Sequence, residues 1–250
     1  MSDKKNLVWS EKHTVHASDT DYRSRGKLSF ILDIMQRAAD SAVSHLGFSL
    51  DEMMQSNMGW MLITLDMDFH RLPRLNDSLN TRTWSKGTRG VFWQRDYRIF
   101  DGTGVEIAAA RSLWALVDIS KRKVLRPNAL PGEVEHYTED SVGEMPDKVS
   151  IPSDVSLNEV FRYQVRYSGV DNYGHLNNAH YGDICCDTLS LHEWEGKSLS
   201  RFQITYIQEA KYGEEMVILA SQVIDRVYIR GQGEDKGTTY FEAMLEFIPE

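Results

Sequence analysis

The polar side chains best suited to chemistry stand close together in the second half of the sequence. The stretch reads Asp171-Asn172-Tyr173-Gly174-His175-Leu176-Asn177-Asn178-Ala179-His180-Tyr181. Aspartate and histidine are residue types that move protons in enzymes. Glycine frees the backbone for a turn, and either asparagine after it can cap a following helix. Taken alone, the stretch is better explained as a polar, capped turn.

An internal repeat changes that interpretation. Ser18 and Asp21 in the first half correspond to Ser168 and Asp171 in the second. The sequence then aligns Gly26-Lys27-Leu28 with Gly174-His175-Leu176. The first half therefore makes the same turn and helix without His-x-Asn-Asn. Since the turn does not require these residues, chemistry becomes the favoured explanation for the second copy.

The elements around the two turns also repeat. Apolar residues recur at steps of three and four over residues 28–46, the spacing of a helix of about five turns with one buried face. The same spacing begins again at Tyr181. Strands are expected after each helix, at 61–69, 91–100 and 105–119, and at 201–206, 216–225, 227–230 and 238–247. A helix followed by an antiparallel sheet, given twice, indicates an α+β tandem repeat.

Proline and acidic residues mark the boundary between the two copies. Four of the six prolines fall within residues 127–152, together with six acidic side chains between 133 and 147. Proline removes backbone donors, and clustered like charges resist collapse. We therefore predict one domain at 1–130, an acidic linker at 131–154 and a second domain at 155–250.

Composition excludes several classes of protein. The 250-residue chain has two cysteines, Cys185 and Cys186, so neither a disulfide framework nor a four-cysteine zinc site is expected. The sequence has no run of about 18 apolar residues that could span a membrane. It opens with no visible secretory signal. These observations predict a cytoplasmic protein.

The charge is unevenly distributed along the chain. Residues 1–130 hold 19 basic and 15 acidic side chains, whereas residues 131–250 hold 9 and 22. The basic excess is too small for binding along nucleic acid, so we expect no nucleic-acid partner. It could still attract an acidic protein, and the basic side chains between residues 71 and 98 are the expected docking surface.

Other catalytic signatures are missing from the sequence. It contains no Gly-x-Ser-x-Gly elbow, no complete dinucleotide fingerprint and no Walker loop. The eight histidines include no His-Glu-x-x-His pair. We therefore expect neither a metal nor a nucleotide cofactor.

The pattern Asp-x-x-Gly-His-Leu-Asn-Asn-x-x-Tyr resembles the hot-dog thioesterases. The tandem arrangement, with Gly59-Trp60 and Tyr206-x-x-Glu209-Ala210, resembles the acyl-acyl-carrier-protein thioesterases of bacteria and plant plastids. The resemblance implies two hot-dog domains, each a long helix wrapped by an antiparallel sheet, packed as an internal pseudo-dimer. It also implies hydrolysis of fatty acyl thioesters on acyl carrier protein, which ends chain synthesis, without metal or organic cofactor.

The resemblance carries over to particular residues. Asp171, His175 and Glu209 match the family's Asp, His and Glu. The family's Asn falls at Tyr173, so either Asn172, one place earlier, substitutes for it or that role is lost. The cysteine that plant members carry after the Glu is an alanine here, which argues against a cysteine nucleophile.

These matches define roles that the chemistry supports. Glu209 is the expected water-activating base, Asp171 positions the site, and His175 hydrogen-bonds the water or the carbonyl. Backbone N–H groups at the start of the following helix would stabilise the oxyanion, and Asn177 and Asn178 are expected to bind substrate.

The first half is expected to support the fold and to line the acyl pocket. It has Lys27 at the histidine position and Pro73 near the glutamate position. Trp60 is the main pocket candidate. Further candidates are the apolar residues Met35, Met54, Met61 and Leu62. Cys185 lies on the apolar stripe of the second helix and is expected to be a small buried hydrophobe rather than a nucleophile.

Three other functions stay open at this point. A thioesterase acting on acyl-coenzyme A would share all of these residues. A hot-dog hydratase also pairs Asp and His, although Glu209 argues against it. A non-catalytic acyl-binding protein would explain Tyr173. Pairing of two chains as a homodimer is also open.

Overall fold

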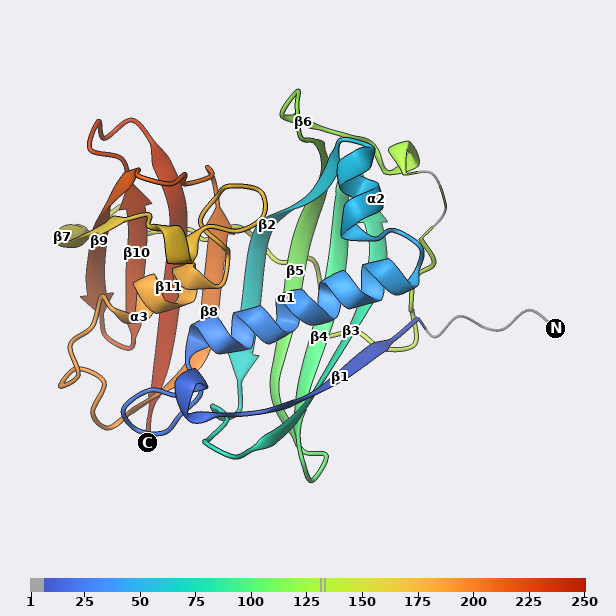
Figure 1. Ribbon diagram of the computed structural model, residues 1–250. Coiled ribbons are helices and arrows are strands. Elements are labelled where there is room, and N and C mark those ends of the chain that lie inside the picture. Colours follow the sequence, from blue (N-terminus) through green and yellow to red (C-terminus); the bar gives the residue numbers. More distant parts are fainter. Residues whose placement is uncertain (1–6, 131, 133) are drawn as a thin grey trace.

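The structure, a computed structural model, describes residues 7–130, 132 and 134–250. Within these residues the chain forms an 11-stranded antiparallel sheet with helices across one face (Figure 1). The first half contributes β1 (Trp9–Thr14), β2 (Met58–Phe69), β3 (Ser78–Arg89), β4 (Phe92–Asp101), β5 (Glu106–Asp118) and β6 (Lys123–Val124). The second half contributes β7 (Asn158–Gln164), β8 (Lys197–Tyr206), β9 (Glu215–Val223), β10 (Arg226–Gln232) and β11 (Thr239–Pro249). The helices are α1 (Leu28–His45), α2 (Leu50–Gln55) and α3 (His180–Cys186).

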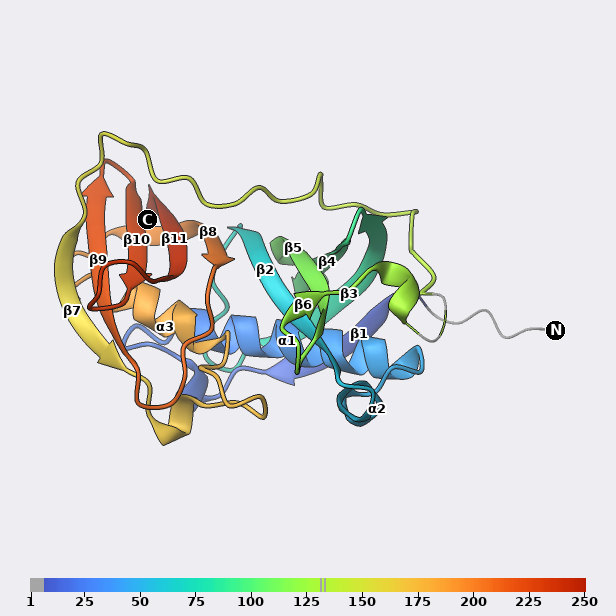
Figure 2. The same cartoon turned by 90° about the horizontal axis from the view of Figure 1, so that it is seen from above.

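The strand order shows the internal repeat directly. Across the sheet it runs β1-β3-β4-β5-β2-β8-β11-β10-β9-β7, with β6 beside β5. Each half therefore has the same order, read outward from the central pair β2–β8. The α1 helix packs against α3 on the same side of the sheet (Figure 2). The predicted α+β fold of two tandem hot-dog units is confirmed.

A buried ion-pair cluster joins the halves at the central strand pair. Asp66 on β2 is 3% exposed and accepts from Arg201 on β8 at 2.8 and 2.9 Å. Arg111 on β5 donates to the same carboxylate at 2.5 Å. Nearby, Thr64 Oγ1 donates to the Ile204 carbonyl at 2.8 Å. Polar side chains thus connect the halves on one face of the sheet.

The α1 helix follows from its sequence pattern. Its buried side chains are Leu28, Ile31, Leu32, Ile34, Met35, Ala38, Ala39 and Ala42. This is the apolar stripe expected from the spacing, so the predicted helix at 28–46 is confirmed. Gly47 follows the helix with φ +93°, a conformation that suits glycine at a helix C-terminus.

The second helix is shorter than expected. It has seven residues, whereas α1 has 18, so the expectation of a long helix in each half is wrong for the second half. Two residues after its end, the Thr188 hydroxyl donates to the Cys185 carbonyl at 2.7 Å, a local hydrogen bond that competes with continuation of the helix. Ser190 then starts a separate polar turn closed by Glu193, whose carboxylate accepts from the Ser190 N–H at 2.8 Å.

Gly182 lets the two helices approach closely. A Cβ placed on it would stand 3.0 Å from the Leu32 side chain and 3.0 Å from the Ser29 amide nitrogen. One cluster of buried side chains includes residues of α1, α3 and the sheet strands of both halves. The two units therefore share a core.

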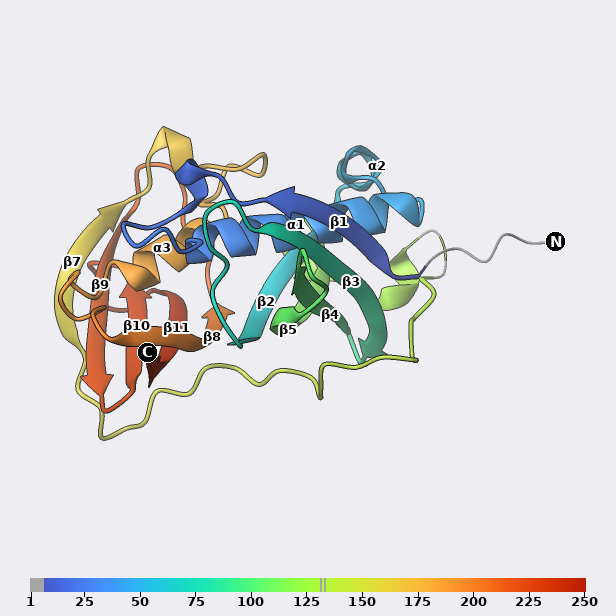
Figure 3. The same cartoon turned by 90° about the horizontal axis from the view of Figure 1, so that it is seen from below.

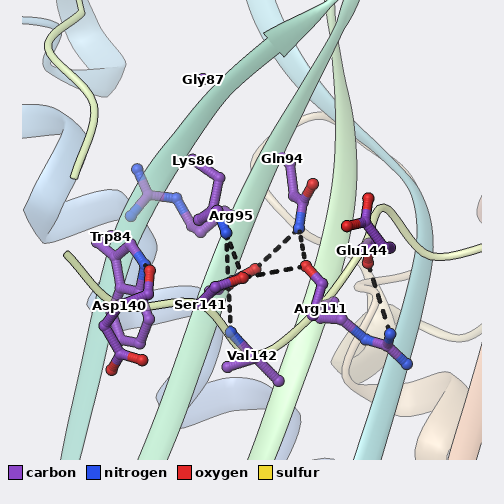
Figure 4. Close-up of polar contacts among 12 residues, drawn as sticks. Trp84, Lys86, Gly87, Gln94, Arg95, Arg111, Asp140, Ser141, Val142 and Glu144 are labelled. Atoms are coloured by element: carbon purple, nitrogen blue, oxygen red, sulfur yellow. Dashed lines mark hydrogen bonds and ion pairs between the residues drawn. The ribbon is translucent and has the colours of Figure 1, made fainter. Parts of the chain in front are cut away.

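Residues 134–157, which we call the strap, cross the face of the sheet opposite to α1 and α3 (Figures 2 and 3). They contain neither helix nor strand. The Val142 N–H donates to Asp96 Oδ2 at 2.8 Å, and the Gly143 carbonyl accepts from Gln94 at 3.2 Å (Figure 4). Farther along, the Val149 N–H donates to Thr205 Oγ1 at 2.8 Å.

The strap covers residues 134–154 of the predicted linker and continues for three residues past its end. Its acidic residues do not simply repel one another, because Asp140 forms an ion pair with Arg98 at 2.9 Å. Its C-terminal part packs Ile151, Val155 and Leu157 against a small apolar cluster on the second half. Two residues of the predicted linker, Pro131 and Glu133, lie outside the described residues.

Candidate active site

A tight turn presents His175. Asp171 Oδ1 accepts from the N–H groups of Tyr173 at 2.9 Å and His175 at 3.2 Å. The Asp171 N–H donates in turn to the His175 carbonyl at 2.9 Å, and Gly174 has φ +81°. The aspartate carboxylate therefore fixes the backbone that carries the histidine.

Glu209 reaches the same place from the segment that follows β8. The Leu176 N–H donates to the Ala210 carbonyl at 2.7 Å, so the turn and this segment are held side by side. His175 Nε2 then lies 3.1 Å from Glu209 Oε2. The Glu209 side chain is 41% exposed, which leaves its second oxygen open to water.

Arg122 is a site residue that the sequence did not single out. It follows β5, in the turn to β6, and its guanidinium lies 3.3 Å from Glu209 Oε2. Tyr173 contacts the first half as well, since a Cβ added to Gly59 would stand 3.7 Å from Tyr173 Cε1. The site is thus built from both halves. In the sequence, the basic run at residues 121–123 was the signal that could have pointed to Arg122.

The structure gives the three predicted asparagines different positions. Asn172 is exposed in the turn, and no hydrogen bond of its side chain is found within the described chain. Asn177 Oδ1 accepts from the Ala179 N–H at 2.8 Å and so closes the turn before α3, but the helix itself, with Ala179 at its N-cap, has no side-chain cap. The Asn178 carbonyl accepts from the Tyr206 hydroxyl at 3.2 Å.

The supply of free backbone donors is smaller than expected. Between residues 173 and 180, each N–H group except that of Asn178 donates to an acceptor in the described protein. The start of α3 therefore does not offer a row of aligned donors. Asn178 offers the single backbone N–H in this stretch that is free to bind an oxyanion.

The contacts also correct the register of the repeat. Arg25 makes the bridge to Arg74 that His175 makes to Lys211, and Ser24 has φ 58° where Gly174 has φ +81°. The first-half residue equivalent to His175 is therefore Arg25, not Lys27. The Gly26 N–H donates to the Pro73 carbonyl as the Leu176 N–H does to Ala210. The residue equivalent to Glu209 is consequently Leu72.

The first-half copy of the turn has a structural role. Asp21 Oδ1 accepts from the N–H groups of Arg23 at 2.8 Å and Arg25 at 2.9 Å, as Asp171 does in the second copy. Arg25 then pairs with Asp21 at 2.9 Å and with Glu250 at 3.2 Å. Its guanidinium also lies over the Trp194 ring. This copy is closed by the second half and carries no histidine–carboxylate pair.

Trp60 lines an apolar cavity between α1 and the first-half strands. The cavity encloses about 520 Å³ of empty space, its open mouth included, and Phe48, Trp93 and Trp114 also line it. The other four predicted pocket residues are not among its described lining. Met35 belongs to the shared core, and Met54 is 43% exposed.

Both cysteines are unsuited to nucleophilic catalysis. Cys185 is fully buried, and both thiols are free. Burial raises the pKa of Cys185 and of Cys186 well above the ordinary value, so both stay protonated. This agrees with the expectation that Cys185 is a small hydrophobe.

The described residues contain neither a metal-binding cluster nor a helix that could cross a membrane. No group of three His, Cys, Asp or Glu side chains is arranged to hold a metal ion. No helix there is both long and apolar enough to cross a membrane.

Solved structures share this architecture over nearly the whole chain. An acyl-ACP thioesterase from Bacteroides thetaiotaomicron superposes with a TM-score of 0.81 at 19% identity, covering 98% of this chain and 100% of its own. A 12:0-ACP thioesterase from Umbellularia californica gives a TM-score of 0.80 at 17% identity, covering 98% of each chain. The fold is therefore that of a double hot-dog protein.

Family models identify the chain more narrowly. The acyl-ACP thioesterase N-terminal domain matches residues 6–130, and the acyl-ACP thioesterase C-terminal domain matches residues 153–249. The chain belongs to the acyl-ACP thioesterase family. A palmitoyl-acyl carrier protein thioesterase from Arabidopsis thaliana is 24% identical over 217 residues, 81% of this chain. The chain spans about half the length of that relative, 52%.

Proposed function

We propose that the protein hydrolyses fatty acyl thioesters carried on acyl carrier protein and releases the free fatty acid. The observation that carries this proposal is the contact of His175 with Glu209, 3.1 Å apart and open to solvent, in the second copy of the repeat. The first copy keeps the same turn but has Arg25 and Leu72 in the equivalent places. The pair is therefore not needed for the fold, and family membership supplies the reaction class.

In the proposed reaction, Glu209 removes a proton from a water molecule that attacks the thioester carbonyl. His175 contacts the same carboxylate and hydrogen-bonds the water or the carbonyl. The Asn178 N–H stabilises the oxyanion of the tetrahedral intermediate. When the C–S bond breaks, the carrier thiolate takes a proton back from Glu209 and the carboxylic acid leaves.

The acyl chain is proposed to occupy the cavity lined by Trp60. Tyr173 lies between the catalytic turn and Gly59, the residue before Trp60, so it stands where the chain would pass. An apolar cavity of this kind suits a flexible hydrocarbon chain. The two free cysteines support the cytoplasm as the compartment. Pairing of two chains remains a prediction.

The carrier protein is proposed to dock near the turn between β5 and β6. The expected surface at residues 71–98 offers less free positive charge than its sequence suggests. Arg71 pairs with Asp77 and Asp101, and Arg98 pairs with Glu106 and Asp140. Lys121 and Lys123 flank Arg122, the residue that contacts Glu209; Lys121 also pairs with Asp118, but its side chain is 73% exposed, and Lys123 is exposed as well. An acidic carrier bound there would present its thioester to the site.

Free-thiol release from acyl carrier protein and acyl-coenzyme A substrates tests this proposal. We expect wild type to cleave carrier-protein substrates, and Glu209→Gln and His175→Ala to lose about 10²- to 10⁴-fold in kcat. His192 and Glu195 form a matched control, since this exposed pair is also 3.2 Å apart. His192→Ala and Glu195→Gln should retain activity.

Two results would contradict the proposal at different points. If Glu209→Gln cleaved its substrates near the wild-type rate, Glu209 would not be the base. If wild type released no thiol from any substrate, the proposed activity itself would be wrong.

A further inference from the structure

The cavity lined by Trp60 contains a buried cation that the proposed reaction does not use. Arg95 on β4 lines it and is 8% exposed. Its neighbour Asp96 bonds to the strap on the outer face, so the alternation of side chains along a strand directs Arg95 toward α1. Its guanidinium makes one hydrogen bond, from Nη1 to Thr83 Oγ1 at 3.2 Å. No carboxylate of the described residues forms an ion pair with it.

An acidic group lines the same cavity from the opposite side. Asp40 lies on α1, and its carboxylate has no hydrogen-bond partner within the described chain. Burial raises the pKa of Asp40 to about 6, although the charge of Arg95 acts in the opposite direction. Asp40 is exposed to solvent, unlike Arg95, and the two groups form no ion pair with each other within the described chain. Both charged groups therefore line the cavity and are free to pair with a ligand in it.

The surrounding indoles add unpaired donors. Trp60 Nε1 and Trp93 Nε1 are buried and have no acceptor, and both residues line the cavity. Their rings pack edge to face, with centroids 5.4 Å apart. A hydrocarbon chain alone would cover the guanidinium and these N–H groups without a partner, which is costly.

Tyr173 connects this cavity with the catalytic turn. Burial, followed by the charges of Asp40 and Asp171, raises the pKa of the Tyr173 phenol. The phenol is thus affected by the charge of one carboxylate that lines the cavity and of one in the turn. A chain attached to a thioester at His175 would pass Tyr173 and meet the polar wall of the cavity.

We propose that the cavity selects acyl chains that carry a hydroxyl group. This inference rests on the proposed thioesterase function and names its substrate class. A hydroxyl group is both a donor and an acceptor, so it can pair with the Asp40 carboxylate as well as with the Arg95 guanidinium, the two charged groups of the lining. A carboxylate substituent would face the Asp40 charge, and an oxo group would leave Asp40 without a donor.

The first test compares kcat/KM for dodecanoyl, 3-hydroxydodecanoyl and 12-hydroxydodecanoyl carrier protein. Wild type should prefer one hydroxylated substrate over dodecanoyl by about tenfold, the effect of one hydrogen bond to a charged group. Arg95→Met and Asp40→Leu should each bring this ratio close to one. Arg226→Met and Asp33→Leu, which change exposed ion-paired residues, are the matched controls and should keep the wild-type ratio.

The second test measures binding without turnover. Tryptophan fluorescence of the His175→Ala variant would report titrations with dodecanoate and the two hydroxydodecanoates. Tighter binding of a hydroxylated acid, lost on adding Arg95→Met, supports the inference even if no thioester is cleaved, so it separates the two proposals. Equal or weaker binding of both hydroxylated acids, or a preference unchanged by both cavity variants, overturns it.

Discussion

Residues 25 and 175 occupy equivalent backbone positions in the two copies of the repeat, but their side chains have different chemistry. In both copies one aspartate, Asp21 in the first and Asp171 in the second, accepts hydrogen bonds from two backbone N–H groups across the turn. The first copy uses this arrangement to hold Arg25 in an ion pair. The contribution of Asp171 to its own turn is therefore structural, which supports the proposal that Glu209 is the carboxylate that transfers the proton.

This difference predicts unequal effects of the two carboxamide substitutions. Asp171→Asn keeps an oxygen that can accept both N–H groups, so we expect kcat within about tenfold of wild type, against about 10²-fold or more lost in Glu209→Gln. Thiol release under saturating substrate measures both. A loss in Asp171→Asn as large as that in Glu209→Gln would mean that Asp171 takes part in the chemistry.

The Asp40 carboxyl group should make the stability of the protein depend on pH. Its folded-state pKa is raised from 3.8 to about 6, so the folded state holds the proton more tightly than the unfolded state. Stability from this group is therefore present below about pH 4 and is lost as pH rises through about 6. Because the side chain is partly open to water, we expect Asp40→Asn to raise Tm at pH 7.5 by only about 2–4 °C.

Thermal melts of Asp40→Asn and wild type between pH 4 and 7.5 check this sign. The difference in Tm should disappear near pH 4 and grow toward neutral pH. Asp33→Asn, on the same helix but at a carboxylate that is ion-paired with Arg37, should show no such trend. A constant difference across the range would mean that Asp40 is not strained by burial.

The candidate site was predictable where residue type and repeat agreed. Asp171, His175 and Glu209 come together as the motif implied. The role of Arg122 could not be predicted, because basic residues are common in turns. Its contact with Glu209 depends on how the two halves pack. Arg95 was counted among docking residues because a sequence does not reveal which face of a strand an arginine occupies.

At the scale of elements, strands were predictable where apolar residues alternate or dominate. The expected strands correspond to β2, β4, β5 and β8 to β11. The strand β3 was missed because most of its inward positions are polar: Leu79 is followed by Thr81, Thr83 and Ser85, all buried. The strands β1 and β7 lie at the sheet edges with alternating or weak burial, so their sequences lack a clear buried face.

The junction between β2 and β8 predicts how strongly the halves depend on each other. Asp66 is almost fully buried between Arg111 and Arg201. Asp66→Asn would leave Arg111 without a charged partner and Arg201 with only its 3.9 Å contact to Asp68, so we expect a loss of about 3 kcal/mol in the free energy of unfolding. Asp68→Asn, two residues along β2 and 55% exposed, should cost less than about 1 kcal/mol.

Urea unfolding of both variants measures this difference. If Asp66→Asn unfolded at the wild-type midpoint, the central strand pair would be held by backbone and apolar contacts alone. A single transition in wild type that splits into two in Asp66→Asn would strengthen the role of the cluster as a connection between the halves.

At the scale of the whole molecule, the two halves contribute different parts of the candidate site. The second half supplies the histidine and the carboxylate, while the first supplies Arg122, the cavity and most of the positive charge. The chain as a whole has a net charge of −9, so an acidic carrier must approach through a local basic surface. The turn at residues 121–123 is basic, exposed and adjacent to Glu209.

Charge reversal at this turn therefore tests docking separately from chemistry. Lys121→Glu with Lys123→Glu should raise the KM for acyl carrier protein about tenfold. Added salt should also raise the KM of the wild type, because it screens the charges that attract the carrier. The uncharged acyl-N-acetylcysteamine thioester should be cleaved equally by wild type and variant, because it needs no basic surface.

Lys148→Glu with Lys236→Glu is the matched control, because it changes the net charge by the same amount at exposed positions elsewhere. If both double variants raised KM equally, the effect would come from overall charge, and the carrier would not dock at this turn.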